Sequence, residues 1–156
     1  MLISLETPGR QDVRELLAEH LAEMHSTSPA ESVHALDLSA LSVPEITFWT
    51  ARDGETLLGC GALKRLSEAA GEIKSMRTTS KARGRGVAGA VLEGIVAEAT
   101  ARGYRDLYLE TGVEDYFAPA RRLYQKFGFV ECQPFADYRP DPNSVFMVRR
   151  LSGIAV

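Results

Sequence analysis

The chain has 156 residues, a length that suits one domain with a buried core. Hydrophobic residues make up 45% of it and charged residues 25%, which is ordinary for a folded protein and argues against disorder. Its net charge of −3 gives no general attraction to nucleic acid, and no run approaches the roughly 20 apolar residues of a membrane helix. We therefore expect a single domain over residues 1–156, with no nucleic-acid and no membrane partner.

The two cysteines, Cys60 and Cys132, form no Cys-x-x-Cys pair and have no histidine pair nearby. This spacing argues against a zinc site and against a disulfide scaffold, so no metal is predicted. The N-terminus also lacks the basic stretch and apolar core of a secretion signal. A reducing cytoplasm is the expected compartment.

The first half of the chain predicts a strand, a helix and then antiparallel strands. Residues 2–7 alternate apolar and polar side chains, and residues 11–24 repeat apolar side chains at helical spacing. Residues 30–44 are predicted to be a loop with at most a short helix. Strands are then predicted over residues 46–52, 56–66 and 72–79, with a hairpin turn at Asp53-Gly54. Gly59 and Gly61 inside a strand indicate a bulge or the close approach of a neighbour.

The second half predicts alternation of helices and strands. A helix begins after the glycine-rich turn near Val87 and ends at Arg102-Gly103, and a second helix begins at Ala118 and stops at Gly128. Strands are predicted over residues 107–111, 130–135 and 145–151, with a proline-containing loop over residues 137–143.

The glycine-rich turn is the strongest functional signal. Gly84, Gly86 and Gly89 let the backbone approach a ligand, and the following helix offers unpaired N–H groups and a positive dipole end. Arg83 and Arg85 flank these glycines and add charge-assisted donors. The turn therefore predicts an anion site, with phosphate as the natural occupant.

Two known patterns fit this turn. Gly84-x-Gly86-x-x-Gly89 matches the dinucleotide fingerprint, with Glu110 near the spacing of a ribose-binding acid. However, the preceding strand is mostly polar, and too little chain follows for the rest of a doubly wound sheet. Arg83-x-x-Gly86-x-Ala88 also resembles the pyrophosphate-binding signature of the GNAT N-acetyltransferase family, and this second interpretation is favoured.

A second motif supports the same family. Residues 118–129 resemble the Ala-x-x-Leu-Tyr-x-x-x-Gly-Phe hallmark of GNAT proteins, and they follow the turn in the right order. Residues 71–78, 109–112 and 141–147 resemble a bacterial group within it, the YsnE-like acetyltransferases. The resemblance implies an α/β (α+β) fold, with a mixed, mostly antiparallel sheet of about seven strands and helices on both faces. Its fourth and fifth strands splay into a V.

The resemblance also implies acetyl-CoA as co-substrate. The pantetheine arm would lie in the V and pair with the backbone of Met76 and Thr78, in the manner of an added strand. The pyrophosphate would rest on the turn and the start of the helix. The implied cofactor-binding residues are Met76, Arg77, Thr78, Arg83, Gly84, Arg85, Gly86, Val87, Ala88 and Gly89.

The activity implied is direct attack of a primary amine, on a small molecule or a peptide, upon the thioester. Glu110 and Glu72 are both candidates for the base, because an amine in water is mostly protonated at neutral pH. Tyr124 matches the family's acid, which protonates the departing thiolate. A backbone N–H of Met76 or Arg77 would polarise the thioester carbonyl.

Two alternatives remain open from the sequence. A non-catalytic acyl-CoA sensor would keep the phosphate turn without needing an acid and a base, and a small dinucleotide-binding oxidoreductase would explain the literal glycine match. A homodimer is also compatible with the sequence.

Overall fold

The computed structural model describes residues 1–27 and 38–151. A seven-stranded sheet runs through the molecule in the order β1-β2-β3-β4-β5-β7-β6. The strands are β1 Leu2–Leu5, β2 Ile46–Asp53, β3 Thr56–Arg65, β4 Ala70–Thr78, β5 Asp106–Gly112, β6 Val130–Glu131 and β7 Ser144–Arg150. The α-helices are α1 Gln11–Thr27, α2 Leu38–Leu41, α3 Val87–Ala101 and α4 Ala118–Lys126, and the short 3₁₀ turns are η2 Ser80–Ala82 and η3 Asp115–Phe117.

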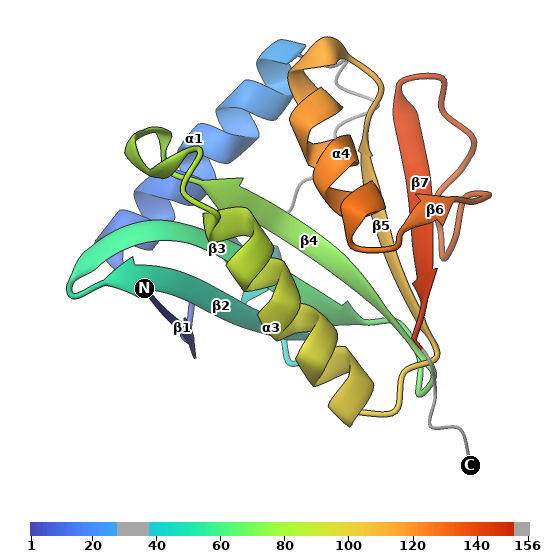
Figure 1. The fold of residues 1–156 in the computed structure, drawn as a ribbon, viewed down its shortest axis with the longest axis horizontal. Coiled ribbons are helices and arrows are strands. Elements are labelled where there is room, and N and C mark those ends of the chain that lie inside the picture. Colours follow the sequence, from blue (N-terminus) through green and yellow to red (C-terminus); the bar gives the residue numbers. More distant parts are fainter. Residues whose placement is uncertain (28–37, 152–156) are drawn as a thin grey trace.

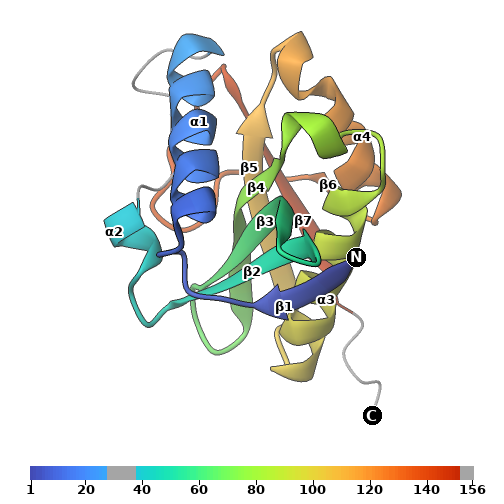
Figure 2. The same cartoon turned by 90° about the vertical axis from the view of Figure 1, so that its left-hand side faces the viewer.

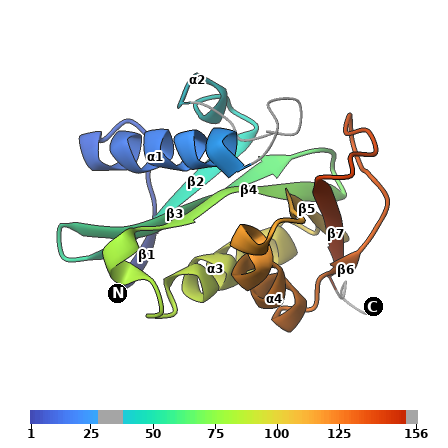
Figure 3. The same ribbon diagram turned by 90° about the horizontal axis from the view of Figure 1, so that it is seen from above.

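Helices cover both faces of the sheet (Figures 2 and 3). The helices α1 and α2 lie on one face, and α3 and α4 lie on the other. Each face has its own apolar cluster, because Leu16 and Leu17 of α1 pack over Cys60, whereas Val91 and Leu92 of α3 belong to the larger cluster opposite. The amphipathic spacing of α1 and the more apolar sequence of α3 account for this arrangement.

The strands β4 and β5 form the parallel pair of an otherwise antiparallel sheet. They pair only from Ala70 opposite Asp106 to Ile73 opposite Leu109. Beyond Ile73 the two strands diverge (Figure 1), which leaves one edge of β4 without a neighbouring strand. The predicted fold class, including the splay between the fourth and fifth strands, is confirmed.

A bulge in β4 determines which way its side chains point. Arg77 pairs with Cys60 and Lys74 pairs with Ala62, so two residues of β4 face Gly61 alone. Ser75 has a φ of 55°, which a residue with a side chain adopts rarely. Such a bulge re-aims the following side chains. Met76 accordingly packs toward the α3 side, while Arg77 reaches α1. A bulge or close approach at Gly61 is confirmed, since a Cβ there would lie 2.6 Å from the Met76 sulfur.

Several predicted elements have different ends in the structure. The strand predicted over residues 130–135 covers only Val130–Glu131, because Phe135 leaves the sheet edge and stacks on Tyr108 with ring centroids 4.6 Å apart. The first strand ends at Leu5, and α1 continues to Thr27. The short helix allowed within residues 30–44 is α2, although residues 28–37 lie outside the described part of the chain. In the described residues, no helix is both long and apolar enough to span a bilayer.

Candidate active site

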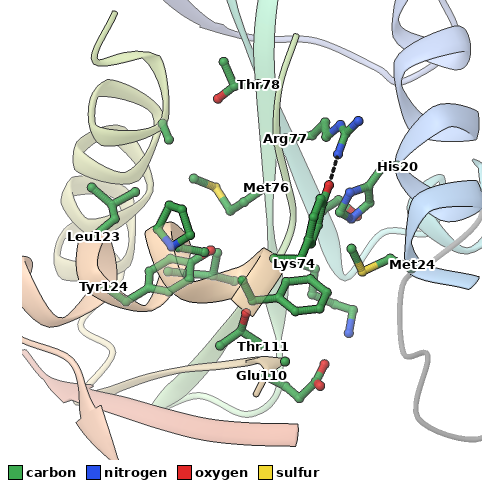
Figure 4. Close-up of a pocket in the computed structure, with 18 of the residues that line it drawn as sticks. His20, Met24, Lys74, Met76, Arg77, Thr78, Glu110, Thr111, Leu123 and Tyr124 are labelled. Carbon is green, nitrogen blue, oxygen red and sulfur yellow. Dashed lines mark hydrogen bonds between the residues drawn. The ribbon is translucent and has the colours of Figure 1, made fainter. Parts of the chain in front are cut away.

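A cavity of about 380 Å³ occupies the open part of the V (Figure 4). Its floor comes from β4 and β5, and the helices α1 and α4 face each other across it. His20 and Met24 enter from α1, and Leu123 and Tyr124 enter from α4. The site is therefore built where the sheet itself has separated.

The glycine-rich turn leads into the N-terminus of α3. Gly84 and Gly86 have φ of 79° and 76°, in the left-handed region that favours glycine. A Cβ added to either one would meet no protein atom within 4 Å, so the turn faces open space. Ala90 donates the first hydrogen bond along α3, to the carbonyl of Gly86. The N–H groups ahead of Ala90 therefore lie at the free end of the helix, as anion binding requires.

The two arginines of the turn differ in position. Both Arg83 and Arg85 are exposed, but Arg83 lines the cavity and Arg85 does not. Arg83 is thus the arginine that lies at the wall of the cavity.

The remaining residues of the phosphate motif have separate structural tasks. Val87 is buried in the core, and Ala88 lines the cavity. Gly89 lies within the first turn of α3, where an added Cβ would make ordinary contact with Phe127 at 3.8 Å. Neither the backbone angle of this third glycine nor the space around it therefore requires a glycine.

The cavity is lined along β4 by Met76, Arg77 and Thr78. The Arg77 guanidinium turns away from the open V and bonds to Glu23 at 2.7 Å and to Glu19, both on α1. It also donates to the Tyr116 hydroxyl at 2.9 Å, the dashed bond in Figure 4. Any contact of Arg77 with a ligand in the V would therefore come from its backbone.

Glu110 is a partly buried carboxylic acid. It lies on β5 at the cavity wall and accepts a hydrogen bond of 2.9 Å from the Ser144 hydroxyl. Burial raises the pKa of Glu110 to about 7, although the Ser144 hydrogen bond and the Lys74 charge act in the opposite direction. A carboxyl group with this pKa exchanges a proton near neutral pH.

Glu72 lies nearby on β4 but is held in a closed network. Its side chain is 3% exposed and accepts hydrogen bonds from the Tyr138 hydroxyl at 2.6 Å and from the Lys74 ammonium at 3.1 Å. Lys74 also donates to the Tyr138 hydroxyl at 2.8 Å. The ion pair of Glu72 with Lys74, which its sequence position allowed, is present.

Tyr124 is buried in α4 and packs edge-on against Phe129, with ring centroids 5.9 Å apart. Its hydroxyl makes no hydrogen bond to another described residue. It is also not one of the fully buried polar atoms without a hydrogen-bond partner, so the hydroxyl oxygen is accessible. The hydroxyl therefore reaches the cavity that the residue lines. Burial raises the pKa of Tyr124, and the charge of Glu110 adds to the effect, so the phenol keeps its proton.

Sequence reasoning assigned no role to several residues that line the cavity, among them His20, Met24, Lys74 and Tyr116. His20 and Met24 could have been suspected from their place beside the apolar stripe of α1. Gly112 also lines the cavity and was assigned no role. A Cβ at this position would lie 2.3 Å from the Phe117 ring. Tyr138 had no signal at all, because its contact with Glu72 joins residues 66 positions apart.

Comparison with known proteins identifies the family. The family model described as the acetyltransferase (GNAT) family matches residues 10–129. The chain belongs to the GNAT acetyltransferases. The sheet with its splayed parallel pair is therefore a GNAT sheet, and the doubly wound dinucleotide fold that the literal glycine match allowed is excluded.

Relatives of this GNAT chain extend over nearly its whole length. It is 57% identical over 143 residues to the uncharacterized N-acetyltransferase YsnE of Bacillus subtilis, covering 92% of this chain and 94% of that protein. It is 42% identical over 150 residues to the IAA acetyltransferase of Azospirillum brasilense, covering 96% and 97% of the two chains. The resemblance to YsnE-like acetyltransferases is confirmed, and the protein is an acetyltransferase by family.

Solved structures share the fold. A protein from Klebsiella pneumoniae that is assigned to the acyl-CoA N-acyltransferases superposes with a TM-score of 0.78 at 27% identity, covering 96% of this chain and 97% of that one. A GNAT acetyltransferase from Elizabethkingia anophelis with acetyl-CoA bound has a TM-score of 0.69 at 19% identity, covering 96% and 97% of the two chains.

Proposed function

We propose that this GNAT domain, residues 1–156, transfers the acetyl group of acetyl-CoA to the primary amine of a small molecule or a peptide by direct attack. One observation carries the proposal. The free end of α3, the unpaired edge of β4, the carboxyl of Glu110 and the hydroxyl of Tyr124 all border the same opening between β4 and β5. These are the groups that a thioester donor and an amine acceptor need.

The residues present suit acetyl-CoA. The N–H groups at the start of α3 and the side chain of Arg83 would hold the pyrophosphate, with Gly84 and Gly86 allowing its close approach. The edge of β4 past Ile73 has no neighbouring strand, so the backbone of Met76 and Thr78 is available for the amide groups of the pantetheine arm. When bound, acetyl-CoA supplies a thioester with an acetyl carbon that an amine can attack.

Glu110 is the better candidate for the base. A carboxylate accepts a proton usefully at neutral pH when its pKa lies near 7, which is the case for Glu110. Glu72 is engaged by Tyr138 and Lys74, and taking up a proton would break that network. We therefore propose that Glu110 accepts a proton from the amine, directly or through a water, and that Glu72 positions Lys74 and the loop that carries Tyr138.

Tyr124 supplies the acid in this proposal. Its phenol keeps its proton at neutral pH and faces the cavity, so it can donate to the sulfur that leaves. A backbone N–H of Met76 or Arg77 would bond to the thioester oxygen as negative charge develops there. Because both described cysteines are free thiols, we also propose a reducing cytoplasmic setting.

Two measurements test this function. Acetyl-CoA at a hundred times its Kd should raise the free energy of unfolding by roughly 2.7 kcal/mol, while NAD should leave it unchanged. Thiol release from acetyl-CoA, followed in the presence and absence of a panel of amines, should require both protein and amine. Stabilisation without amine-dependent thiol release would instead support the non-catalytic acyl-CoA sensor.

A further inference from the structure

The cavity extends past the open V to a region beside α1, which we call the α1 lobe. It is formed by His20, Met24, Lys74, Tyr116 and Phe117. This lobe lies across the cavity from Leu123 and Tyr124 (Figure 4). Since the opening between β4 and β5 suits the donor, the α1 lobe is the remaining space for the body of an acceptor. This role of the lobe rests on the proposed function.

Among the described residues, the two cationic groups that border the lobe are already paired within the protein. Lys74, with a side chain 8% exposed, is bound to Glu72 and to the Tyr138 hydroxyl. Arg77 is bound to Glu23 and Glu19, and it also donates to Tyr116.

The carboxylates beside the lobe are taken up in the same networks. The Tyr116 hydroxyl donates to Glu23, and the hydrogen bond from Arg77 lowers the pKa of Glu23 to about 2, so this carboxylate stays ionised. Glu72 accepts from Lys74 and Tyr138. Among the described residues of the lobe, neither sign of charge is left for a ligand, and Arg83, the other cation that lines the cavity, is assigned to the pyrophosphate.

The other groups of the lobe are uncharged. Burial, assisted by the charge of Arg77, lowers the pKa of His20 to about 4, so its imidazole is neutral at physiological pH. The imidazole has no hydrogen-bond partner among the described residues. Its Nδ1 is fully buried and has no hydrogen-bond partner. Its Nε2 is not fully buried, so Nε2 is the ring nitrogen that is accessible from the cavity that His20 lines. Met24 and Phe117 add apolar surface.

We infer that the α1 lobe selects a monoamine acceptor with a body that carries no second charge. Of the described carboxyl groups at or beside the cavity, Glu110 is the one left for the amine, because Glu23 and Glu72 are engaged. A second ammonium or a carboxylate on the acceptor body would lose its water and find no free counter-charge among the described residues of the lobe, which is strongly unfavourable. A neutral polar group is acceptable, because Nε2 of His20 offers it a hydrogen bond.

Four amines of equal length test this inference, namely hexylamine, aminohexanol, aminohexanoate and hexanediamine, each with its second group at the far end. Thiol release at saturating acetyl-CoA gives kcat/KM for each one. Hexylamine and aminohexanol should exceed the two charged amines by about tenfold or more, because a charged end must be buried unpaired. Equal rates for all four, or a preference for aminohexanoate or hexanediamine, would overturn the inference and leave the proposed function standing. Thiol release with none of the four would overturn the inference, and absence of thiol release with every amine of the wider panel would overturn the proposed function as well.

A substitution in the α1 lobe adds an independent test. Glu23→Gln removes one negative charge beside Arg77, so the ratio of kcat/KM for aminohexanoate to that for hexylamine should rise about three- to tenfold. Glu15→Gln is the matched control, because Glu15 lies on the same helix with an exposed contact to Gln11. An unchanged ratio in folded Glu23→Gln, equal to that of Glu15→Gln, would mean that the acceptor body lies elsewhere.

Discussion

Glu110 lies where burial favours the neutral form of a carboxyl group and the proposed reaction needs the charged one. Between the ordinary pKa of 4.5 and the value of about 7 in the fold, the folded protein binds more protons at Glu110 than the unfolded chain does. The free energy of unfolding therefore falls as pH rises through this range. Glu110→Gln removes the effect, and the variant should be more stable than wild type by about 1–3 kcal/mol at pH 8 and equal to it near pH 4.

The same variant should be catalytically impaired. If Glu110 is the base, the rise of kcat/KM with an apparent pKa near 7 should disappear in Glu110→Gln and persist in Glu72→Gln. Denaturant unfolding at several pH values and pH–rate profiles with one amine measure the two effects. Loss of that rise in Glu72→Gln alone would place the base on β4.

Tyr124 offers a second test at a single atom. Tyr124→Phe keeps the ring against Phe129 and removes the hydroxyl, so kcat should fall by roughly 10²-fold or more with little change in KM. Tyr108→Phe makes the same chemical change outside the cavity, on a ring that stacks on Phe135, and should keep wild-type kcat. Undiminished kcat in Tyr124→Phe would leave this tyrosine with a packing role.

Single residues show how far sequence reasoning reaches. The positions of Tyr124 and Glu110 at the cavity follow from motifs that are local in the chain. The pairing of Arg77 could not be predicted, because its partners Glu23 and Glu19 are 54 and 58 positions away and on another element. Likewise, the choice between Glu72 and Glu110 depends on burial and on Tyr138, which no local pattern encodes.

At the scale of an element, the turn before α3 separates the roles of its glycines. Gly86→Ala should weaken acetyl-CoA binding, since the new Cβ points into the open space of the proposed phosphate site. It should also cost about 1–2 kcal/mol of stability, because φ at this position is 76°. Gly89→Ala should keep binding and gain up to about 1 kcal/mol, since it lies in a helix with ordinary space around its Cβ.

Calorimetric titration with acetyl-CoA and denaturant unfolding measure both quantities. Wild-type affinity for acetyl-CoA in both the Gly86 and the Gly89 variant would show that the phosphates do not rest on this turn. The contrast could not be drawn from the sequence, where the three glycines look alike and only their backbone angles distinguish them.

At the scale of the whole molecule, the order of elements was predictable and the ends of some were not. Two motifs placed a polar strand before a phosphate turn and a tyrosine on the next helix, which together imply the splayed sheet. The bulge at Ser75 and the departure of Phe135 from the last hairpin depend on packing between distant segments. Propensity alone therefore extended the strand predicted over residues 130–135 too far.

The proposed function depends above all on the opening between β4 and β5 holding acetyl-CoA. Hydrogen–deuterium exchange of backbone amides, with acetyl-CoA and with NAD as the control, tests this most directly. We predict slower exchange with acetyl-CoA over residues 74–78 and 86–90, where the arm and the phosphates would bond to the backbone, and none of this protection with NAD. Unchanged exchange over residues 74–78, with protection confined to β1 or β6 at the sheet edges, would contradict it.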